Sequence, residues 1–171
     1  MKKFAFLGLF LTTASFATSY KAVALELVDT PLRMMVANNE AKIIRVSFDG
    51  EVAGGTCKMK TAIPRRTLLS ILPIEIDYSR CQWSTVKMLT RYEIREIDQL
   101  IDAARGGVIQ SGGPVYCMAV PTRNRVMTAD SGQILLQQGT FPCGPQTVNS
   151  SKAARRLVSR LQGFLNEYGQ L

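Results

Sequence analysis

The sequence contains no histidine, and this absence excludes several kinds of catalytic and metal site at once. A Ser-His-Asp triad, a Cys-His pair and a histidine-ligated zinc site each need at least one imidazole group. Beyond its first residues the chain also lacks an apolar run of the roughly 20 residues that a membrane-spanning helix requires. We therefore expect no metal, no cofactor and no transmembrane segment, and we lean toward a protein that is not an enzyme.

The first residues have the pattern of a cleavable secretory signal. Two lysines precede an apolar run over residues 4–16, and a basic start followed by about 7–15 apolar residues is typical of such signals. Small residues fit cleavage after Ser19, and a cut after Ala24 is the alternative. We expect a bacterial-type signal peptide over 1–19 and a single mature domain over 20–171. The mature protein is then periplasmic or secreted.

Four cysteines lie in the expected mature chain, and none of them forms a close C-x-x-C pair. An even number of cysteines in an exported chain predicts two disulfides, and four cysteines allow three connectivities. A weak repeat between residues 42–107 and 108–171 favours pairing within each half, because each half has a glycine pair, two cysteines and a Thr-Val pair. The repeat predicts two similar disulfide-bridged halves, with the pairs Cys57–Cys81 and Cys117–Cys143. The other connectivities stay open.

Hydrophobic periodicity and turn residues predict the fold class. Strand-like patterns flank Asp49-Gly50 and also flank residues 130–132, and such turns between two strand patterns predict β-hairpins. Apolar residues with helical spacing predict helices over about 90–105 and about 150–168. We therefore predict an α+β fold in which antiparallel hairpins form a sheet and two helices pack on one face.

Positive charge exceeds negative charge in this chain, with 21 lysines and arginines against 13 aspartates and glutamates. A basic protein favours anionic partners. Two arginine clusters follow prolines in corresponding loops of the repeat, and an arginine presents a planar fork of donors that suits carboxylate or phosphate. The predicted binding residues are Arg65, Arg66, Arg123 and Arg125. Aromatic residues are not interleaved with these clusters, so a nucleic acid partner is not indicated.

Paired carboxylates provide the main alternative to a binding protein. Glu75 with Asp77, and Glu93 with Glu96, are close in sequence, and a glycoside hydrolase acts through two carboxyl groups. The same residues also fit the solvated face of a strand or a helix. We therefore expect an exported, disulfide-stabilised binding or inhibitory protein that engages an acidic partner or an anionic ligand. An envelope glycan or cell-wall hydrolase and a structural envelope component are the alternatives.

Overall fold

The computed structural model describes residues 22–31, 40–60, 75–112 and 123–170. The expected signal peptide over 1–19 lies outside these residues, and so do three residues that the sequence singled out: Arg65, Arg66 and Cys117. Their roles therefore stay predictions.

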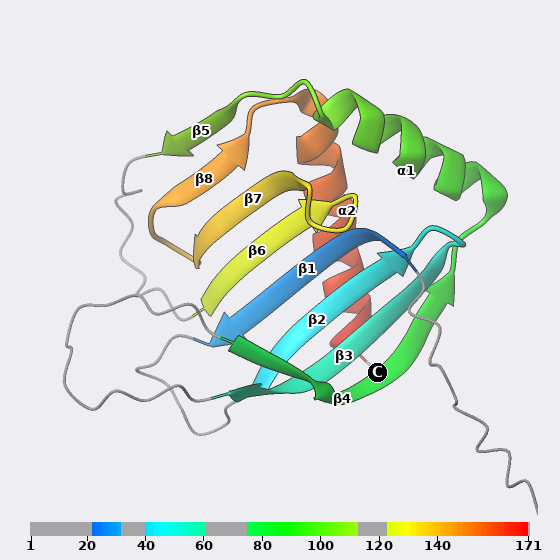
Figure 1. The fold of residues 1–171 in the computed structure, drawn as a ribbon, viewed down its shortest axis with the longest axis vertical. Helices are drawn as coiled ribbons and strands as arrows, with labels where there is room; N and C mark the ends of the chain where they lie inside the picture. Colours follow the sequence, from blue (N-terminus) through cyan, green and yellow to red (C-terminus); the bar gives the residue numbers. More distant parts are fainter. Residues whose placement is uncertain (1–21, 32–39, 61–74, 113–122, 171) are drawn as a thin grey trace, which may run out of the picture.

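One antiparallel sheet of eight strands forms the body of the described structure (Figure 1). The strand order is β4-β3-β2-β1-β6-β7-β8-β5, so β1 and β6 pair at the centre. The predicted α+β class with an antiparallel sheet and two helices is confirmed. The strands are β1 (Val23–Pro31), β2 (Glu40–Ser47), β3 (Glu51–Lys60), β4 (Glu75–Met88), β5 (Ile109–Gly112), β6 (Arg123–Ala129), β7 (Ile134–Phe141) and β8 (Gln146–Asn149).

Both predicted hairpins are present, and each turn uses residues that tolerate positive φ. Gly50 joins β2 to β3 with φ 88°, and its missing side chain leaves room for Ile94. Asp130 and Ser131 join β6 to β7 with φ near 50°, followed by Gly132 with φ 89°. Glycine carries no steric penalty in this region, and aspartate visits it more readily than most residues. The turn chemistry therefore gave the correct hairpin positions.

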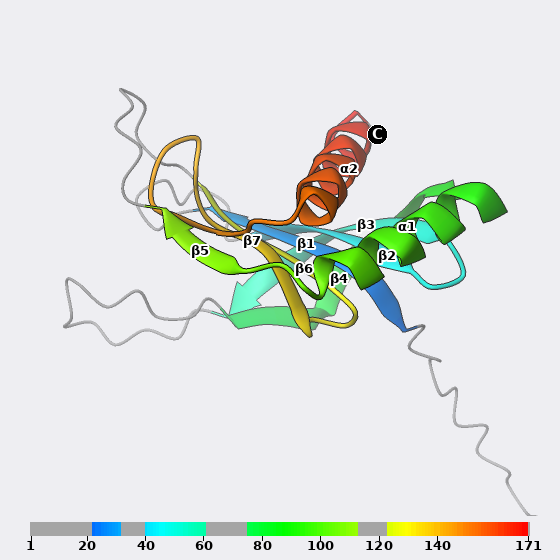
Figure 2. The ribbon, with the colours of Figure 1, turned by 90° about the horizontal axis from the view of Figure 1, so that it is seen from above.

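Both predicted helices are confirmed with nearly the predicted bounds, as α1 (Arg91–Ala104) and α2 (Lys152–Tyr168). A capping box between Thr90 and Glu93 begins α1, and the Ser151 hydroxyl accepts a hydrogen bond from the Ala154 N–H at the start of α2. The two helices pack against each other, and α2 lies across one face of the sheet (Figure 2). Neither helix is long and apolar enough to cross a membrane.

The main hydrophobic core lies between α2, α1 and one face of the sheet. Side chains alternate between the two faces of a strand, so every second residue of the central strands enters this core. Leu25 and Leu27 of β1, Ile44 of β2 and Met127 of β6 are completely buried there. We call this side of the sheet the helix face, and the opposite side the open face.

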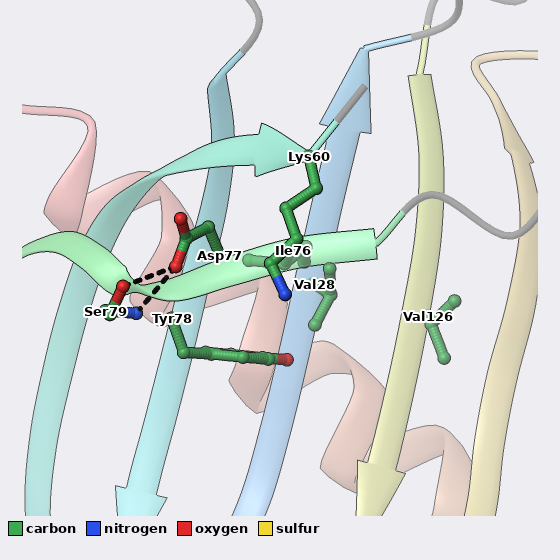
Figure 3. Close-up of a pocket in the computed structure, with 7 residues that line it drawn as sticks. All are labelled: Val28, Lys60, Ile76, Asp77, Tyr78, Ser79 and Val126. Atoms are coloured by element: carbon green, nitrogen blue, oxygen red, sulfur yellow. Dashed lines mark hydrogen bonds between the residues drawn. The ribbon is translucent and has the colours of Figure 1, made fainter. Parts of the chain in front are cut away.

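The first part of β4 stays paired with the last residues of β3, and the two strand ends together cross the open face (Figures 2 and 3). Cys57 of β3 pairs with Cys81, but the next residue, Lys58, pairs with Asp77, so residues 78–80 form a bulge. A bulge bends its strand and increases the local twist. We call residues 75–80 the arm. It gives the open face a wall that a flat sheet would lack.

The predicted Cys57–Cys81 disulfide is present and joins β3 to β4 at the base of the arm. Cys57 is completely buried on the open face. Closing a loop of 24 residues stabilises a fold by about 3 kcal/mol, mostly by restricting the unfolded chain. Such a bond fits an oxidising compartment outside the cytosol. Because Cys117 lies outside the described residues, the Cys117–Cys143 pair and the second disulfide-bridged half stay predictions.

Candidate functional site

The structure places two of the predicted binding residues on a strand. Arg123 and Arg125 belong to β6, so their expected position in a loop is wrong. They pair with Pro31 and Asp29 at the end of β1, and alternation along the strand from the core residue Met127 places both side chains on the helix face. Asp29 of β1 faces Arg125 directly across the strand pair. The structure therefore brings these two predicted arginines together around one carboxylate.

Asp29 is the anchor of this arginine cluster. Its side chain is only 4% exposed, and a buried carboxylate stays ionised at low cost only when charges and hydrogen-bond donors surround it. The Nε of Arg123 donates to Oδ1 of Asp29 at 2.6 Å, and a second nitrogen of Arg123 donates to the Asp29 carbonyl. The Nε of Arg125 lies 3.4 Å from Oδ2.

Arg125 differs from Arg123 in that its Nε donates no hydrogen bond to the described residues. Its Nε is buried, and the geometry to Asp29 gives an ion pair without a hydrogen bond, so this donor has no hydrogen-bond acceptor among the described residues. The guanidinium lies 4.9 Å from the ring centroid of Phe141, which holds it by a cation–π contact. Two guanidinium groups share one carboxylate, so the cluster of Asp29, Arg123 and Arg125 keeps one excess positive charge.

A second candidate site lies on the open face, where the arm and the central strands border an open hollow of about 750 Å³ (Figure 3). Val28 of β1 and Val126 of β6 form its apolar floor, and Ile76 and Tyr78 of the arm form its wall. Polar side chains stand at the rim, namely Lys60, Asp77 and Ser79. An apolar floor with a few polar groups around it is the usual composition of a ligand site.

Asp77 is held in its ionised form at this rim. The Ser79 hydroxyl donates to Oδ1 of Asp77 at 2.5 Å, and the Ser79 N–H donates to the same atom at 3.2 Å. These bonds lower the pKa of Asp77 below its ordinary value, and the nearby cations Arg80 and Lys60 add to the effect. Asp77 therefore offers a fixed hydrogen-bond acceptor beside the hollow.

An aromatic cluster extends the hollow along the open face. The Arg45 guanidinium lies 4.6 Å from the ring centroid of Tyr78 and 4.9 Å from that of Trp83. Its Nε donates to the Glu26 carboxylate at 3.0 Å, which fixes the guanidinium between the two rings. Burial raises the pKa of the Tyr78 hydroxyl, and the negative charge of Glu26 raises it further. Tyr78 and Trp83 are nevertheless 39% and 40% exposed.

Two consecutive glycines of β3 make room for aromatic rings on opposite faces of the sheet. A Cβ atom at Gly55 would lie 2.7 Å from the Trp83 ring on the open face, and a Cβ at Gly54 would lie 2.3 Å from the Tyr168 ring on the helix face. A glycine inside a strand often marks such a close approach. This Gly-Gly pair was the available sequence signal for the aromatic cluster, whose members Arg45, Tyr78 and Trp83 the sequence analysis missed.

Three of the candidate carboxylates of a hydrolase, Asp77, Glu93 and Glu96, are engaged in local structure. Glu93 closes the capping box of α1, and the Thr90 N–H and hydroxyl lower its pKa below the ordinary value. Glu96 forms an ion pair with Arg160 of α2. A general acid of a glycosidase needs a raised pKa, whereas the pKa values of Asp77 and Glu93 are lowered. In the described ranges no three Cys, Asp or Glu side chains gather into a metal-binding group.

Comparison with protein families, with curated proteins and with solved structures finds no match for this chain.

Proposed function

We propose that this protein is an exported, disulfide-stabilised binding or inhibitory protein, and that it engages an anionic ligand or the acidic surface of a partner. The observation that carries the proposal is the arginine cluster, in which Arg123 and Arg125 share the single buried carboxylate of Asp29. A carboxylate or phosphate of the partner supplies the second negative charge that the cluster lacks among the described residues.

The chemistry of arginine supports an anionic partner. A guanidinium carries five N–H donors in a planar fork, and one carboxylate cannot satisfy the forks of two arginines. Asp29 and Phe141 hold the two side chains in place, so little conformational entropy is lost when an anion binds. Both arginine side chains are partly exposed, at 32% and 24%, so an incoming anion can reach them.

The predicted binding residues Arg65 and Arg66 lie outside the described residues. They lie in the sequence between Lys60, where β3 ends, and Glu75, where β4 begins. Both strand ends lie at the end of the sheet where β6 begins (Figure 1). We propose that these two arginines engage the same anionic partner as Arg123 and Arg125.

The experiment compares Arg125→Gln with Arg156→Gln, because each variant removes one positive charge. Arg156 lies exposed on α2, outside the cluster. Asp29 keeps Arg123 as its partner in Arg125→Gln, so no buried charge is left unpaired. We expect Arg125→Gln to weaken the capture of partners from a cell-envelope extract about tenfold, since a hydrogen bond to a charged group contributes about 1.5–3 kcal/mol. Arg156→Gln should capture the same partners as the unmodified protein.

A titration with inorganic phosphate tests the same site without a protein partner. The NMR signals of the Arg123 and Arg125 Nε–H groups should shift with phosphate and return as salt is added, because salt screens exposed charges. Equal capture by the two variants, together with arginine signals that ignore phosphate, would disprove the proposal.

The two alternatives from the sequence stay predictions that no described contact favours. A carboxylate hydrolase requires a pair of acidic groups with one raised pKa in a cleft. A structural envelope component requires stable self-association of the purified protein, which its sedimentation measures directly.

A further inference from the structure

The open face carries a second set of exposed groups that the arginine cluster does not use. It combines the hollow beside the arm with the aromatic cluster around Arg45. We propose that this face is a separate binding site for a neutral oligosaccharide built from pyranose rings with equatorial substituents. The proposal does not depend on the anionic partner.

The aromatic side chains give the first argument. Such a pyranose has an apolar face of C–H groups that are polarised by the neighbouring oxygens, and the electron-rich face of an aromatic ring attracts positively polarised hydrogens. Tyr78 and Trp83 stand on one face of the sheet, and each keeps about 40% of its surface exposed. Arg45 lies against both rings, so their orientation is fixed before a ligand binds.

The polar side chains of the open face give the second argument, because they match the hydroxyl groups of a sugar. Arg45 offers donors and Glu26 offers acceptors next to Tyr78, while Asp77 and Ser79 stand at the rim of the hollow. A hydroxyl group donates one hydrogen bond and accepts two, so paired donors and acceptors satisfy it. The valine floor of the hollow suits a C–H face or a methyl group.

The balance of charge selects a neutral ligand over an anion. Arg45 is paired with Glu26, and the two charged residues that line the hollow, Lys60 and Asp77, have opposite signs. The open-face site therefore offers hydrogen bonds without the excess positive charge of the arginine cluster. A long acyl chain fits poorly too, because charged groups stand beside the apolar floor and the hollow is open to solvent.

The protein contains its own reporter, since Trp83 is the only tryptophan in the chain. Two neutral probes, N,N′,N″-triacetylchitotriose and cellotriose, share a backbone and differ in the acetamido groups. We expect at least one of them to change the Trp83 emission saturably and to protect Trp83 from quenching by acrylamide. Calorimetry with the same probe gives the dissociation constant independently of the fluorescence.

Tyr78→Ala is the decisive variant, and Tyr92→Ala is its matched control. Tyr92 lies on α1 and is 77% exposed, away from the hollow. We expect Tyr78→Ala to weaken binding of the probe about fivefold or more, since it removes the ring face on which the sugar stacks. Tyr92→Ala should leave the dissociation constant unchanged, and Tyr78→Phe, which keeps the ring, should retain most of the binding.

Three outcomes would overturn the proposal. The first is that neither oligosaccharide changes the emission or the quenching of Trp83. The second is that Tyr78→Ala and Tyr92→Ala bind the probe equally well. The third is that decanoate, an anionic amphiphile, binds at this face while the sugars do not. Arg125→Gln should bind the oligosaccharide like the unmodified protein, so the failure of one proposal does not imply failure of the other.

Discussion

At the scale of single residues, two glycines of β3 make room for aromatic rings because they carry no side chain. Gly54 and Gly55 each support an aromatic ring, one on either face of the sheet. On the helix face, the Tyr168 hydroxyl also forms a hydrogen bond of 2.9 Å with Thr56. Thr56 lies two residues after Gly54, on the same face of β3. The C-terminal turn of α2 is therefore fixed to β3 by both a packing contact and a polar contact.

Gly54→Ala tests this contact. The new Cβ would lie 2.3 Å from the Tyr168 ring, so the ring has to move, and overpacking of this kind costs about 1–3 kcal/mol. We expect the free energy of unfolding, measured in urea, to fall by that amount. The matched control is Gly163→Ala in α2, where no atom lies within 4 Å of the new Cβ. This control should stabilise the protein by about 0.5–1 kcal/mol, because alanine favours a helix more than glycine does.

A double variant distinguishes a steric clash from a loss of strand flexibility. With Tyr168→Ala in the background, Gly54→Ala should cost little, because the ring that it displaces is gone. Simple additivity of the two substitutions would contradict the packing explanation.

The anchor of the arginine cluster, Asp29, could not be predicted from the sequence. Arg123 and Arg125 stand out in the sequence as basic residues after a proline, and that pattern made them predicted binding residues. Their anchor, Asp29, is 94 residues away in the chain, so no local pattern connects it to them. Only the pairing of β1 with β6 places this carboxylate beneath both guanidinium groups.

At the scale of elements, the start of α1 is a self-contained unit. The Thr90 hydroxyl accepts a hydrogen bond from the Glu93 N–H, and the Glu93 carboxylate accepts one from the Thr90 N–H at 2.8 Å. The carboxylate also sits at the positive end of the helix dipole. These interactions favour the ionised carboxylate and lower the pKa of Glu93 from its ordinary value of 4.5.

This lowered pKa predicts how the contribution of the cap depends on pH. The ionised carboxylate stabilises the fold fully above pH 4.5, and this stabilisation is lost as the pH falls through the lowered pKa of the folded state. Glu93→Gln keeps an acceptor but does not titrate. We therefore expect its deficit in unfolding free energy, relative to the unmodified protein, to be largest near neutral pH and to shrink in acid. Thermal unfolding at several pH values measures the difference, and a deficit that does not vary with pH would contradict it.

The arm is the element whose path the sequence predicted least. The Cys57–Cys81 pair at its base was correctly predicted. The bulge at residues 78–80 was not foreseen, because a bulge depends on how two distant strands share their hydrogen bonds. This bulge turns Tyr78 toward Arg45 and creates the wall of the hollow.

At the scale of the whole molecule, the two faces of the sheet carry different structural features. The helix face holds the main core beneath α1 and α2, and the open face carries the arm, the hollow and the aromatic cluster (Figures 2 and 3). The arginine cluster lies on the helix face at one end of the sheet. A protein with this layout has room for two partners at once, since the two proposed sites lie on opposite faces.

The disulfide between Cys117 and Cys143 is a prediction at the scale of the whole molecule. Peptide mapping of the non-reduced protein should give one peptide that joins Cys57 to Cys81 and another that joins Cys117 to Cys143. The same measurement identifies the mature N-terminus, which we expect at Tyr20 if the signal is cut after Ser19. A peptide joining Cys57 to Cys143 would contradict both the structure and the predicted repeat.

The sequence by itself determined the features that depend on neighbouring residues. The two hairpin turns and the two helices follow from turn chemistry and periodicity, whose physical causes act over a few residues, and the weak repeat favoured the Cys57–Cys81 pair. Tertiary structure alone decided the strand order, the arm across the open face, and the contacts that define both sites. Those contacts join residues as far apart as Thr56 and Tyr168, and they form only when the whole chain has folded into one sheet under two helices.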